Sequence, residues 1–282
     1  MSEKHLELLS NALNPEEHKA KNKPYVGYFP DEQGGGANEK IYYNYPKKKM
    51  TFIDLGLPSG TKWATCNIGA ENPEDAGMYF QWADTQGYTA DQVGTEEGKK
   101  KFAMDWSDYK YASGTGETAV MTKYNETDGL TVIQEEDDAA VAFGGVMPPM
   151  NYLYELKVNC TWTAVPDEQK GEGYIKGFTA TGPNGNSIFL PASGGAFEGG
   201  IYSIGELGAF WSGSVYGPVA VDLYLSGGPY VLASERFGGE TIRPCQIGTG
   251  PVPDFDPETL KSHDSVLDFL FGRNRGVEPI EK

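Results

Sequence analysis

Histidine is scarce in this sequence. Only three of the 282 residues are histidine, and His5, His18 and His263 all lie outside the central block of the chain, residues 49–247. A Ser-His-Asp or Cys-His catalytic arrangement within that block is therefore excluded, and so is a histidine-based zinc or iron site. No phosphate-binding loop or dinucleotide fingerprint occurs in a strand-to-helix context. We therefore expect a non-enzymatic protein with no cofactor and no metal.

Cysteine is scarce as well. Cys66, Cys160 and Cys245 are widely spaced, and no CxxC pair indicates a zinc site. An odd number of cysteines at this spacing is a poor disulfide framework. Buried free thiols are expected, and a disulfide between Cys66 and Cys160 is the alternative.

Two further shortages argue against membranes and nucleic acids as partners. No apolar run reaches the roughly 18 residues that span a bilayer, and the first residues lack the apolar segment of a secretory signal. Basic residues number 23 against 40 acidic ones, which gives a net charge of −17. Such a surface repels phosphates and anionic lipids, so we expect no nucleic acid partner and no membrane insertion.

Glycine and proline are abundant, with 37 and 18 residues respectively. This composition is typical of a loop-rich globular protein. Shifts in composition divide the chain into three parts. Residues 1–48 predict a helix and an extended arm, residues 49–247 predict a folded domain, and residues 248–282 predict a proline-rich linker followed by an amphipathic helix.

Alternation, apolar runs and turn residues predict the elements of the central domain. The acidic start of 135–143 is typical of a first helical turn. The pattern predicts strands at 51–57 and 62–69, an irregular excursion at 86–130, helices at 135–143 and 150–159, a hairpin at 178–192, and two or three short strands within 208–245.

Both ends of the chain leave alternatives open. The arm at 24–48 is either an extended segment that seeks a partner or wraps the domain, or a disordered leader. In the tail, Asp256, Pro257 and Glu258 form an N-cap pattern ahead of an apolar stripe that begins at Leu260. That stripe is buried either on the core, which we favour, or on a partner.

Several long motifs occur in a fixed order. They are FIDLGLPSGTKWATCNIGAENPEDAGMYFQWAD (52–84), EEDDAAVAFGG (135–145), NCTWT (159–163), GPNGNSIFLPASG (182–194) and FWSGS followed by IRPC (210–245). In this order they resemble the major paralogous (FISUMP-type) domain of gut-bacterial surface proteins and their phages, over residues 50–247. The resemblance implies an α+β, C-type-lectin-like fold. Such a domain is loop-rich, with short helices and a small twisted antiparallel sheet.

The sequence departs from that family at two positions. Val146 stands where the family has the arginine of Trp-Arg-Met-Pro-Thr, so a buried arginine is not carried over. Gly213 stands in place of a usual serine in FWSGS, which indicates a local change in that strand.

Some members of the family are targets of diversity-generating retroelements, which randomise chosen codons. Their fixed frame resembles Trp211, Ser212, Ser214, Ala220, Leu223, Arg236, Gly239, Arg243 and Pro244. Of these, Trp211, Ser212, Arg236 and Arg243 are expected to form the scaffold, while Glu235 and Glu240 are fixed or unrelated. Ordinary strand alternation is the alternative explanation. The resemblance implies ligand contacts at Val215, Tyr216, Gly217, Pro218, Val219, Val221, Asp222, Tyr224, Pro229, Tyr230, Leu232, Ala233, Ser234, Phe237 and Gly238.

Other activities of this fold group lack their residues. Formylglycine-generating enzymes use paired cysteines near the last strands, where this chain has Cys245 alone. The calcium-binding motifs of sugar-binding C-type lectins are missing. A structural calcium at Asp137 and Asp138 is an alternative, and a glycosidase that uses a carboxylate pair is a weaker one.

The sequence thus predicts a receptor-binding protein on a phage particle. Its ligand would be a protein or glycan on a cell surface, bound through exposed Tyr216, Tyr224, Tyr230 and Phe237. Residues 1–48 would attach it to virion proteins or to sister subunits, for example in a trimer. The missing secretory signal favours the virion over a bacterial cell surface or the cytoplasm. The alternatives are a structural decoration or cement protein and a bacterial surface adhesin.

Overall fold

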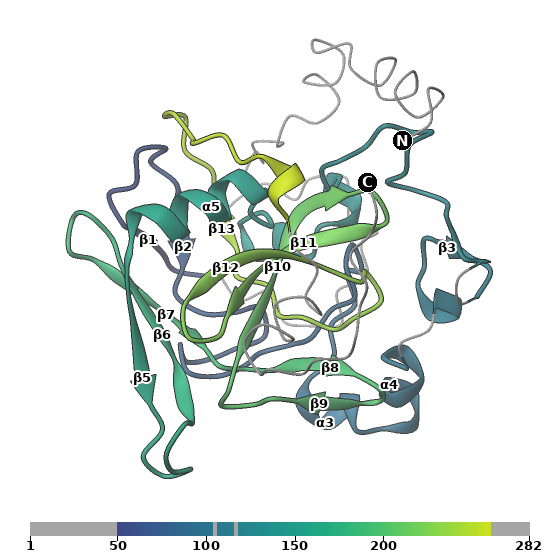
Figure 1. Ribbon diagram of the computed structural model, residues 1–282, viewed down its shortest axis with the longest axis horizontal. Coiled ribbons are helices and arrows are strands. Elements are labelled where there is room, and N and C mark those ends of the chain that lie inside the picture. The colour runs from purple at the N-terminus through teal and green to yellow at the C-terminus, as the bar shows by residue number, and fades with distance from the viewer. Residues whose placement is uncertain (1–49, 104–105, 116–117, 261–282) are drawn as a thin grey trace, which may run out of the picture.

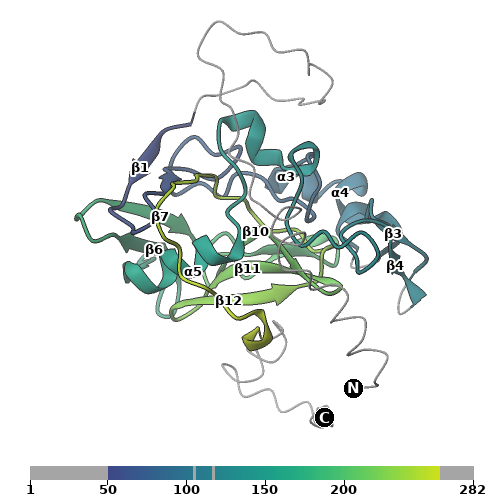
Figure 2. The ribbon, with the colours of Figure 1, turned by 90° about the horizontal axis from the view of Figure 1, so that it is seen from above.

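The computed structural model describes residues 50–103, 106–115 and 118–260 (Figure 1, Figure 2). The helix and arm expected in residues 1–48, and the helix expected after residue 260, lie outside the described residues. None of the helices in the described part has the length and apolar character needed to cross a bilayer. The described part therefore covers the predicted central domain and the first residues of the tail.

Short antiparallel strands make up most of the regular structure. Within the described residues they form five small sheets, joined by long loops and a few short helices. This confirms the expected loop-rich α+β class. In pairing order the sheets are β1–β2–β13 (Phe52–Asp54, Lys62–Ala64, Cys245–Gln246), β5–β6–β7 (Thr161–Pro166, Ile175–Thr181, Ser187–Pro191), β10–β11–β12 (Gly208–Tyr216, Val219–Leu225, Pro229–Ser234), β3–β4 (Ala112–Ser113, Val120–Met121) and β8–β9 (Gly195–Phe197, Gly200–Tyr202).

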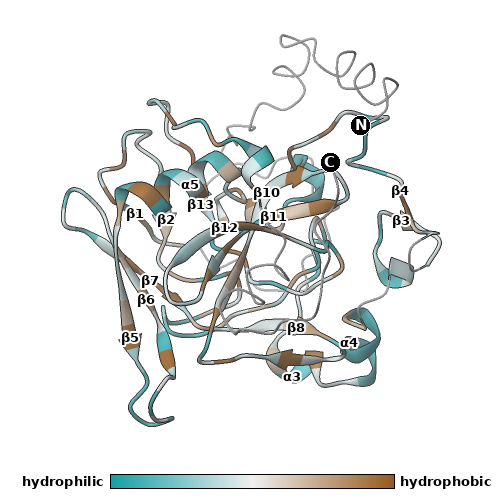
Figure 3. Ribbon diagram, in the orientation of Figure 1, coloured by the Kyte–Doolittle hydropathy of each residue, from teal (hydrophilic) through white to brown (hydrophobic). Residues whose placement is uncertain are grey.

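The β10–β11–β12 sheet, here called the central sheet, is buried on both faces. Successive side chains of a strand alternate between the two faces. On one face Val221 joins the main core with helix α5 (Met150–Asn159) and the β5–β6–β7 sheet. On the other face Trp211 and Ala220 join a second core, and Tyr224 lies in a smaller apolar cluster. The hydrophobic stretches along these strands in Figure 3 follow from this two-sided burial.

Helix α5 confirms the helix predicted at 150–159. It follows Pro149 and buries Leu153 and Leu156 in the main core. Glu155 is also buried, and its carboxylate accepts hydrogen bonds from the Ser59 backbone N–H at 2.8 Å and from the Ser59 hydroxyl at 2.6 Å. These bonds offset the cost of burying the carboxylate and join the helix to the loop before β2.

The prediction of one helix at 135–143 is wrong. The segment forms two 3-10 turns, η3 (Glu135–Asp137) and η4 (Ala139–Phe143). Asp138 between them has an extended backbone, and its carboxylate accepts a hydrogen bond from the Ala140 N–H at 2.8 Å. Aspartate caps a helix start better than it continues one. The helix suggested by the acidic residues is therefore interrupted at Asp138.

The hairpin predicted at 178–192 is confirmed as β6 and β7. Its turn is tied to β1, because the side-chain amides of Asn184 and Asn186 donate to the Asp54 carbonyl at 2.9 Å and 2.8 Å. Gly185, with a φ of 84°, supplies the left-handed backbone that the turn requires.

The other strand predictions hold in outline. β1 and β2 fall inside 51–57 and 62–69 but are shorter than these ranges. The region 208–245 supplies the three strands of the central sheet and the first residue of β13.

The excursion at 86–130 is more regular than predicted. Thr89 and Gln92 form a reciprocal capping box. The Thr-x-x-Gln spacing is a known signal for a helix start, but the polar composition of the region led to a prediction of irregular structure. The box begins the first of two short helices. The excursion holds α3 (Ala90–Val93), α4 (Glu96–Lys101), the 3-10 turn η1 (Trp106–Asp108) and the β3–β4 pair.

The described part of the tail packs on the domain. The ring of Phe255 lies 5.1 Å from that of Tyr154 on α5, centroid to centroid. Asp256 is an N-cap as predicted, because it accepts a hydrogen bond from the Glu258 N–H at 3.0 Å. It caps only the 3-10 turn η5 (Pro257–Thr259), after which Leu260 has an extended backbone, so the predicted helix does not begin here. The predicted linker is therefore docked on α5 over these residues.

All three cysteines are free thiols, so the alternative of a Cys66–Cys160 disulfide is wrong, but the expected burial holds for Cys245 alone. Cys245 is buried in the main core, whereas Cys66 and Cys160 are half-buried. Burial, with a smaller contribution from the charge of Glu155, raises the pKa of the Cys160 thiol to about 11. Cys160 is therefore a poor nucleophile.

Val146 explains the first departure from the family pattern. It exchanges backbone hydrogen bonds with Cys245 at 2.9 Å and 3.0 Å, and its side chain is buried in the main core. An arginine here would place a charge among apolar side chains.

Gly213 explains the second departure and gives a prediction. A Cβ at this position would lie 2.9 Å from both the Ile133 Cγ2 and the Met147 carbonyl oxygen. We expect Gly213→Ala to lower the free energy of unfolding by about 1–3 kcal/mol, because the core is already filled. Urea denaturation measures this. Gly228→Ala is the matched control, since a Cβ there meets nothing within 4 Å. Equal stability of the two variants would contradict the packing around Gly213.

Candidate binding surface on the central sheet

The positions predicted to contact a ligand do not form one exposed surface. The turn between β10 and β11, residues Tyr216 to Val219, is here called the hairpin tip. Its residues Tyr216, Gly217 and Pro218 are exposed. Of the other predicted positions, Val219, Pro229, Tyr230, Ser234 and Gly238 are half-buried, and Val215, Val221, Asp222, Tyr224, Leu232, Ala233 and Phe237 are buried.

The accessible candidates also lie at opposite ends of the central sheet. Ser234 lies opposite Ala220, close to the hairpin tip, whereas Tyr230 lies opposite Tyr224 toward the far end of β11. At about 3.4 Å per residue, these two pairs are about 14 Å apart along the strand. Tyr216 and Tyr230, which were expected to act together, therefore belong to different ends of the sheet. Successive turns of an antiparallel meander always alternate in this way.

The expectation that Tyr224 and Phe237 are exposed is wrong. Tyr224 is 0% exposed and Phe237 is 7% exposed. Tyr224 packs against Leu207 and Leu232, and the Phe237 ring meets the Trp106 ring edge to face at 4.7 Å. The prediction assumed a sheet with one solvent-exposed face, as antiparallel sheets often have. Here loops and turns cover the second face as well.

Asp222 belongs to a buried polar cluster and not to an exposed one. Its carboxylate accepts a hydrogen bond from the Ser234 hydroxyl at 2.5 Å, and Glu240 lies beside it. Burial raises the pKa of Glu240 well above its ordinary value, and the charge of Asp222 and a hydrogen bond with it add to the effect. The two carboxyl groups are in direct contact and buried, so they are not placed to flank a sugar as glycosidase residues must be.

Arg236 holds the hairpin tip from inside the protein. It is 0% exposed. Its Nη2 donates to the Gly217 carbonyl at 2.5 Å and to the Tyr124 carbonyl at 3.0 Å. Its guanidinium also lies over the Trp82 ring, 5.4 Å from the centroid. An arginine presents several donors in a rigid fork, so one side chain fixes the tip against two other segments.

Trp211 and Ser212 connect the central sheet to the segment that contains Phe80 and Trp82. The Trp211 indole donates to the Phe80 carbonyl at 2.7 Å, and the Trp82 indole donates back to the Ser212 carbonyl at 2.8 Å. Both β10 residues are fully buried. This exchange holds the base of the tip in a fixed position.

Arg243 lies away from the tip, where it joins the segment before β13 to the end of β2. Its Nε donates to the Asn67 side-chain oxygen at 2.9 Å, and its Nη1 donates to the Ala64 carbonyl at 3.1 Å. Burial lowers the pKa of this guanidinium. The structure therefore buries all four predicted scaffold residues and gives each a hydrogen bond to another segment.

One residue at the tip was missed by sequence reasoning. The Glu258 carboxylate in the docked tail accepts a hydrogen bond from the Tyr216 hydroxyl at 2.5 Å. This bond, with smaller effects of burial and of negative charge, raises the pKa of Tyr216 to about 12. No local signal could have linked these residues, because 42 positions separate them in the sequence. The tail thus borders the hairpin tip, and Tyr216 is still 37% exposed.

Asp137 organises the loop beside the tip. Its carboxylate accepts hydrogen bonds from two ammonium groups and two tyrosine hydroxyls. Burial by itself raises the pKa of this carboxyl, but the four hydrogen bonds outweigh burial and hold the pKa below its ordinary value. The donors are Lys110 at 2.8 Å, Lys123 at 2.7 Å, Tyr111 at 2.5 Å and Tyr124 at 2.7 Å.

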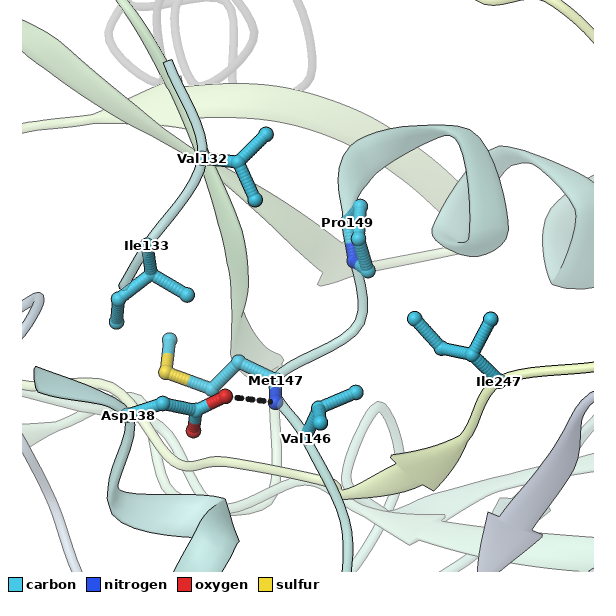
Figure 4. A pocket seen from close by; sticks show the side chains of 7 residues that line it. All are labelled: Val132, Ile133, Asp138, Val146, Met147, Pro149 and Ile247. Carbon is cyan, nitrogen blue, oxygen red and sulfur yellow. Dashed lines mark hydrogen bonds between the residues drawn. The ribbon is translucent and has the colours of Figure 1, made fainter. Parts of the chain in front are cut away.

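The same contacts weigh against the calcium site proposed as an alternative at Asp137 and Asp138. Cations already surround Asp137, and Asp138 accepts the backbone N–H groups of Ala140 and Met147, each at 2.8 Å. Figure 4 shows the second of these bonds at the side of a cavity of about 10 Å³, which has room for a water molecule at most. Within the described residues, no three His, Cys, Asp or Glu side chains are grouped to hold a metal ion.

Comparison of the chain with protein-family models, with curated proteins and with solved structures finds no match.

The contacts of Asp137 give a prediction about stability and pH. We expect Asp137→Asn to lower the free energy of unfolding by about 2–4 kcal/mol at neutral pH, because Lys110 and Lys123 lose their shared carboxylate. The wild-type contribution is present above the unfolded pKa of about 4 and is lost as the pH falls through the lower folded pKa. The variant lacks this contribution, so its stability should depend less on pH in the acid range.

Urea denaturation between neutral pH and acid measures both effects. Glu135→Gln is the control, because Glu135 is an exposed neighbour in η3. It should leave the midpoint and the acid dependence close to those of the wild type. Identical acid curves for Asp137→Asn and the wild type would show that the carboxylate does not carry the effect.

Proposed function

We propose that the protein is a non-enzymatic binding protein. It presents the hairpin tip of a C-type-lectin-like domain, of the major paralogous type, to a protein or glycan on a cell surface. One observation carries the proposal. Arg236, fully buried, donates a hydrogen bond to the carbonyl of exposed Gly217, so the core positions the tip directly. A rigid frame that carries an exposed turn is a common design for recognition.

The composition of the tip suits binding. Tyr216 offers a large amphipathic side chain with few rotatable bonds, and Pro218 limits the freedom of the turn. Because the frame already fixes the tip, little conformational entropy remains to be lost when a ligand binds. The proposed surface is smaller than the sequence suggested. It comprises the tip and its half-buried neighbour Ser234, and it leaves Tyr230 at the other end of the sheet.

The attachment and location belong to the same proposal. Residues 1–48 would join the domain to virion proteins or to sister subunits, and the protein would be displayed on a phage particle. A bacterial cell surface and the cytoplasm are the alternative locations. Many tips on one particle would add avidity to a weak single contact.

The tip can be tested by substitution. We expect the double variant Tyr216→Ala/Pro218→Ala to lose at least about tenfold in affinity, as removal of an aromatic anchor does. The measurement is binding of labelled protein to a panel of immobilised glycans and intact bacterial cells. Tyr202→Ala is the matched control, because Tyr202 is exposed to a similar degree, 42% against 37% for Tyr216. Unfolding curves check that both variants fold. Undiminished binding by the double variant would place the binding site elsewhere.

A structural role, as a decoration or cement protein, is the second candidate. The observation that favours it is the burial of seven of the fifteen predicted contact positions, Tyr224 and Phe237 among them. In that role the central sheet is ordinary core, and the tip is a permanent packing contact. A diversified binder and a structural protein differ in how their genes vary.

Sequencing of the gene across a natural population separates these two functions. If the tip is diversified, substitutions should concentrate at residues 216–219 and at Ser234. Val221 and Leu232 should stay constant, because truncating a buried aliphatic side chain costs about 2–5 kcal/mol. Variation spread evenly over the exposed surface would favour the structural role.

A further inference from the structure

Among the residues that the structure describes, nothing covers strand β5 at the edge of its sheet. Within the described residues it pairs with β6 alone, and Figure 1 shows it at the outer boundary of the molecule. Its side chains at Thr161, Thr163, Ala164 and Pro166 are exposed. In an antiparallel edge strand every second residue points its N–H and C=O groups away from its neighbour. The strand thus offers backbone groups that another strand can bind.

This edge lacks the usual protection against pairing. None of its 6 residues, TWTAVP, is charged, although the chain as a whole carries a net charge of −17. Natural edge strands are commonly blocked by lysine or by inward-pointing charges. Pro166 and the register shift next to it disrupt only the last part of the strand. Residues 161–164 therefore form a neutral, β-prone edge.

The part of the sheet face beside residues 161–163 is also uncharged. Thr161 lies opposite Thr181, and Thr163 lies opposite Thr179, so a block of threonine hydroxyls faces outward. An approaching copy of this acidic protein meets no like charge at this surface. The net charge of −17 disfavours the approach of a second copy in general.

The charges at the two ends of β5 indicate which partner fits. The turn that follows the strand, residues 167–174, carries three carboxylates and one lysine. At the other end Lys157 lies in the last turn of α5, and its carbonyl accepts a hydrogen bond from the Trp162 indole at 3.2 Å. In an antiparallel pair the start of one strand opposes the end of the other. Antiparallel pairing of two β5 strands would therefore bring Lys157 of each copy toward the acidic turn of the other copy.

From this arrangement we propose that two copies of the protein associate through antiparallel pairing of their β5 strands. The two three-stranded sheets become one continuous sheet across a two-fold axis, as isologous dimers require. The contact is short, so the association is weak and depends on concentration. It does not involve residues 1–48 or the hairpin tip, and it holds whether or not the tip binds a ligand. A dimer of this kind would carry two tips.

Sedimentation velocity of the full chain over a concentration series tests the contact. We expect the wild type to show a monomer–dimer equilibrium. Thr163→Lys should raise the dissociation constant about tenfold or more, because it places a lysine on each of the two paired edge strands. Val120→Lys is the matched control, with the same charge change at a strand residue that is 65% exposed. The proposal is overturned if the wild type is monomeric throughout, or if both lysine variants associate as the wild type does.

A charge exchange tests the antiparallel direction. Lys157→Glu and Glu168→Lys should each weaken association, since each places like charges together at both ends of the paired strands. The double variant restores opposite charges and should recover most of the wild-type association. Far-UV circular dichroism and unfolding midpoints establish that each variant folds. If the double variant associates no better than the single ones, the strands do not pair in this direction.

Discussion

The buried charge of Arg236 constrains the structure around the hairpin tip. Among the described residues its guanidinium is met by the backbone carbonyls of Lys123, Tyr124 and Gly217 and by the face of the Trp82 ring, with no carboxylate within ion-pair distance. A buried cation without such partners would cost several kcal/mol, so these segments must stay together for the protein to be stable. The exposed turn therefore takes its conformation from a hydrogen bond made inside the protein.

The same principle operates elsewhere in the domain. Isolated backbone bridges, such as Gly194 with Gly208, join one small sheet to the next. Side chains that donate to backbone carbonyls supply further links. Trp211 and Trp82 exchange such bonds across two segments, and Arg243 joins the segment before β13 to Asn67 and the end of β2. Tryptophan and arginine are suited to this, because each buries a large apolar or planar body and keeps a donor at its end. A loop-rich chain gains a defined structure in this way without long helices.

Local patterns predicted the elements that depend on local chemistry. The hairpin at β6–β7 and helix α5 follow from turn residues and from the spacing of Leu153 and Leu156. The failure at 135–143 is also local, because Asp138 prefers to cap Ala140 and interrupts the helix. The capping box of Thr89 and Gln92 was readable from the sequence. The candidate site was predicted less well, since only the tip and a few half-buried positions are accessible.

The sequence by itself determined the α+β class, the position of the turns, and the absence of histidine from the central block. It also singled out Trp211, Arg236 and Arg243, which the structure buries. Only the tertiary structure decided which residues reach the surface. Alternation assigns a side chain to one face of a strand, but the cover on that face comes from distant segments. For this reason Tyr224 is buried, and Tyr216 meets Glu258 of the tail, 42 residues away. Such contacts depend on the whole fold and leave no local trace in the sequence.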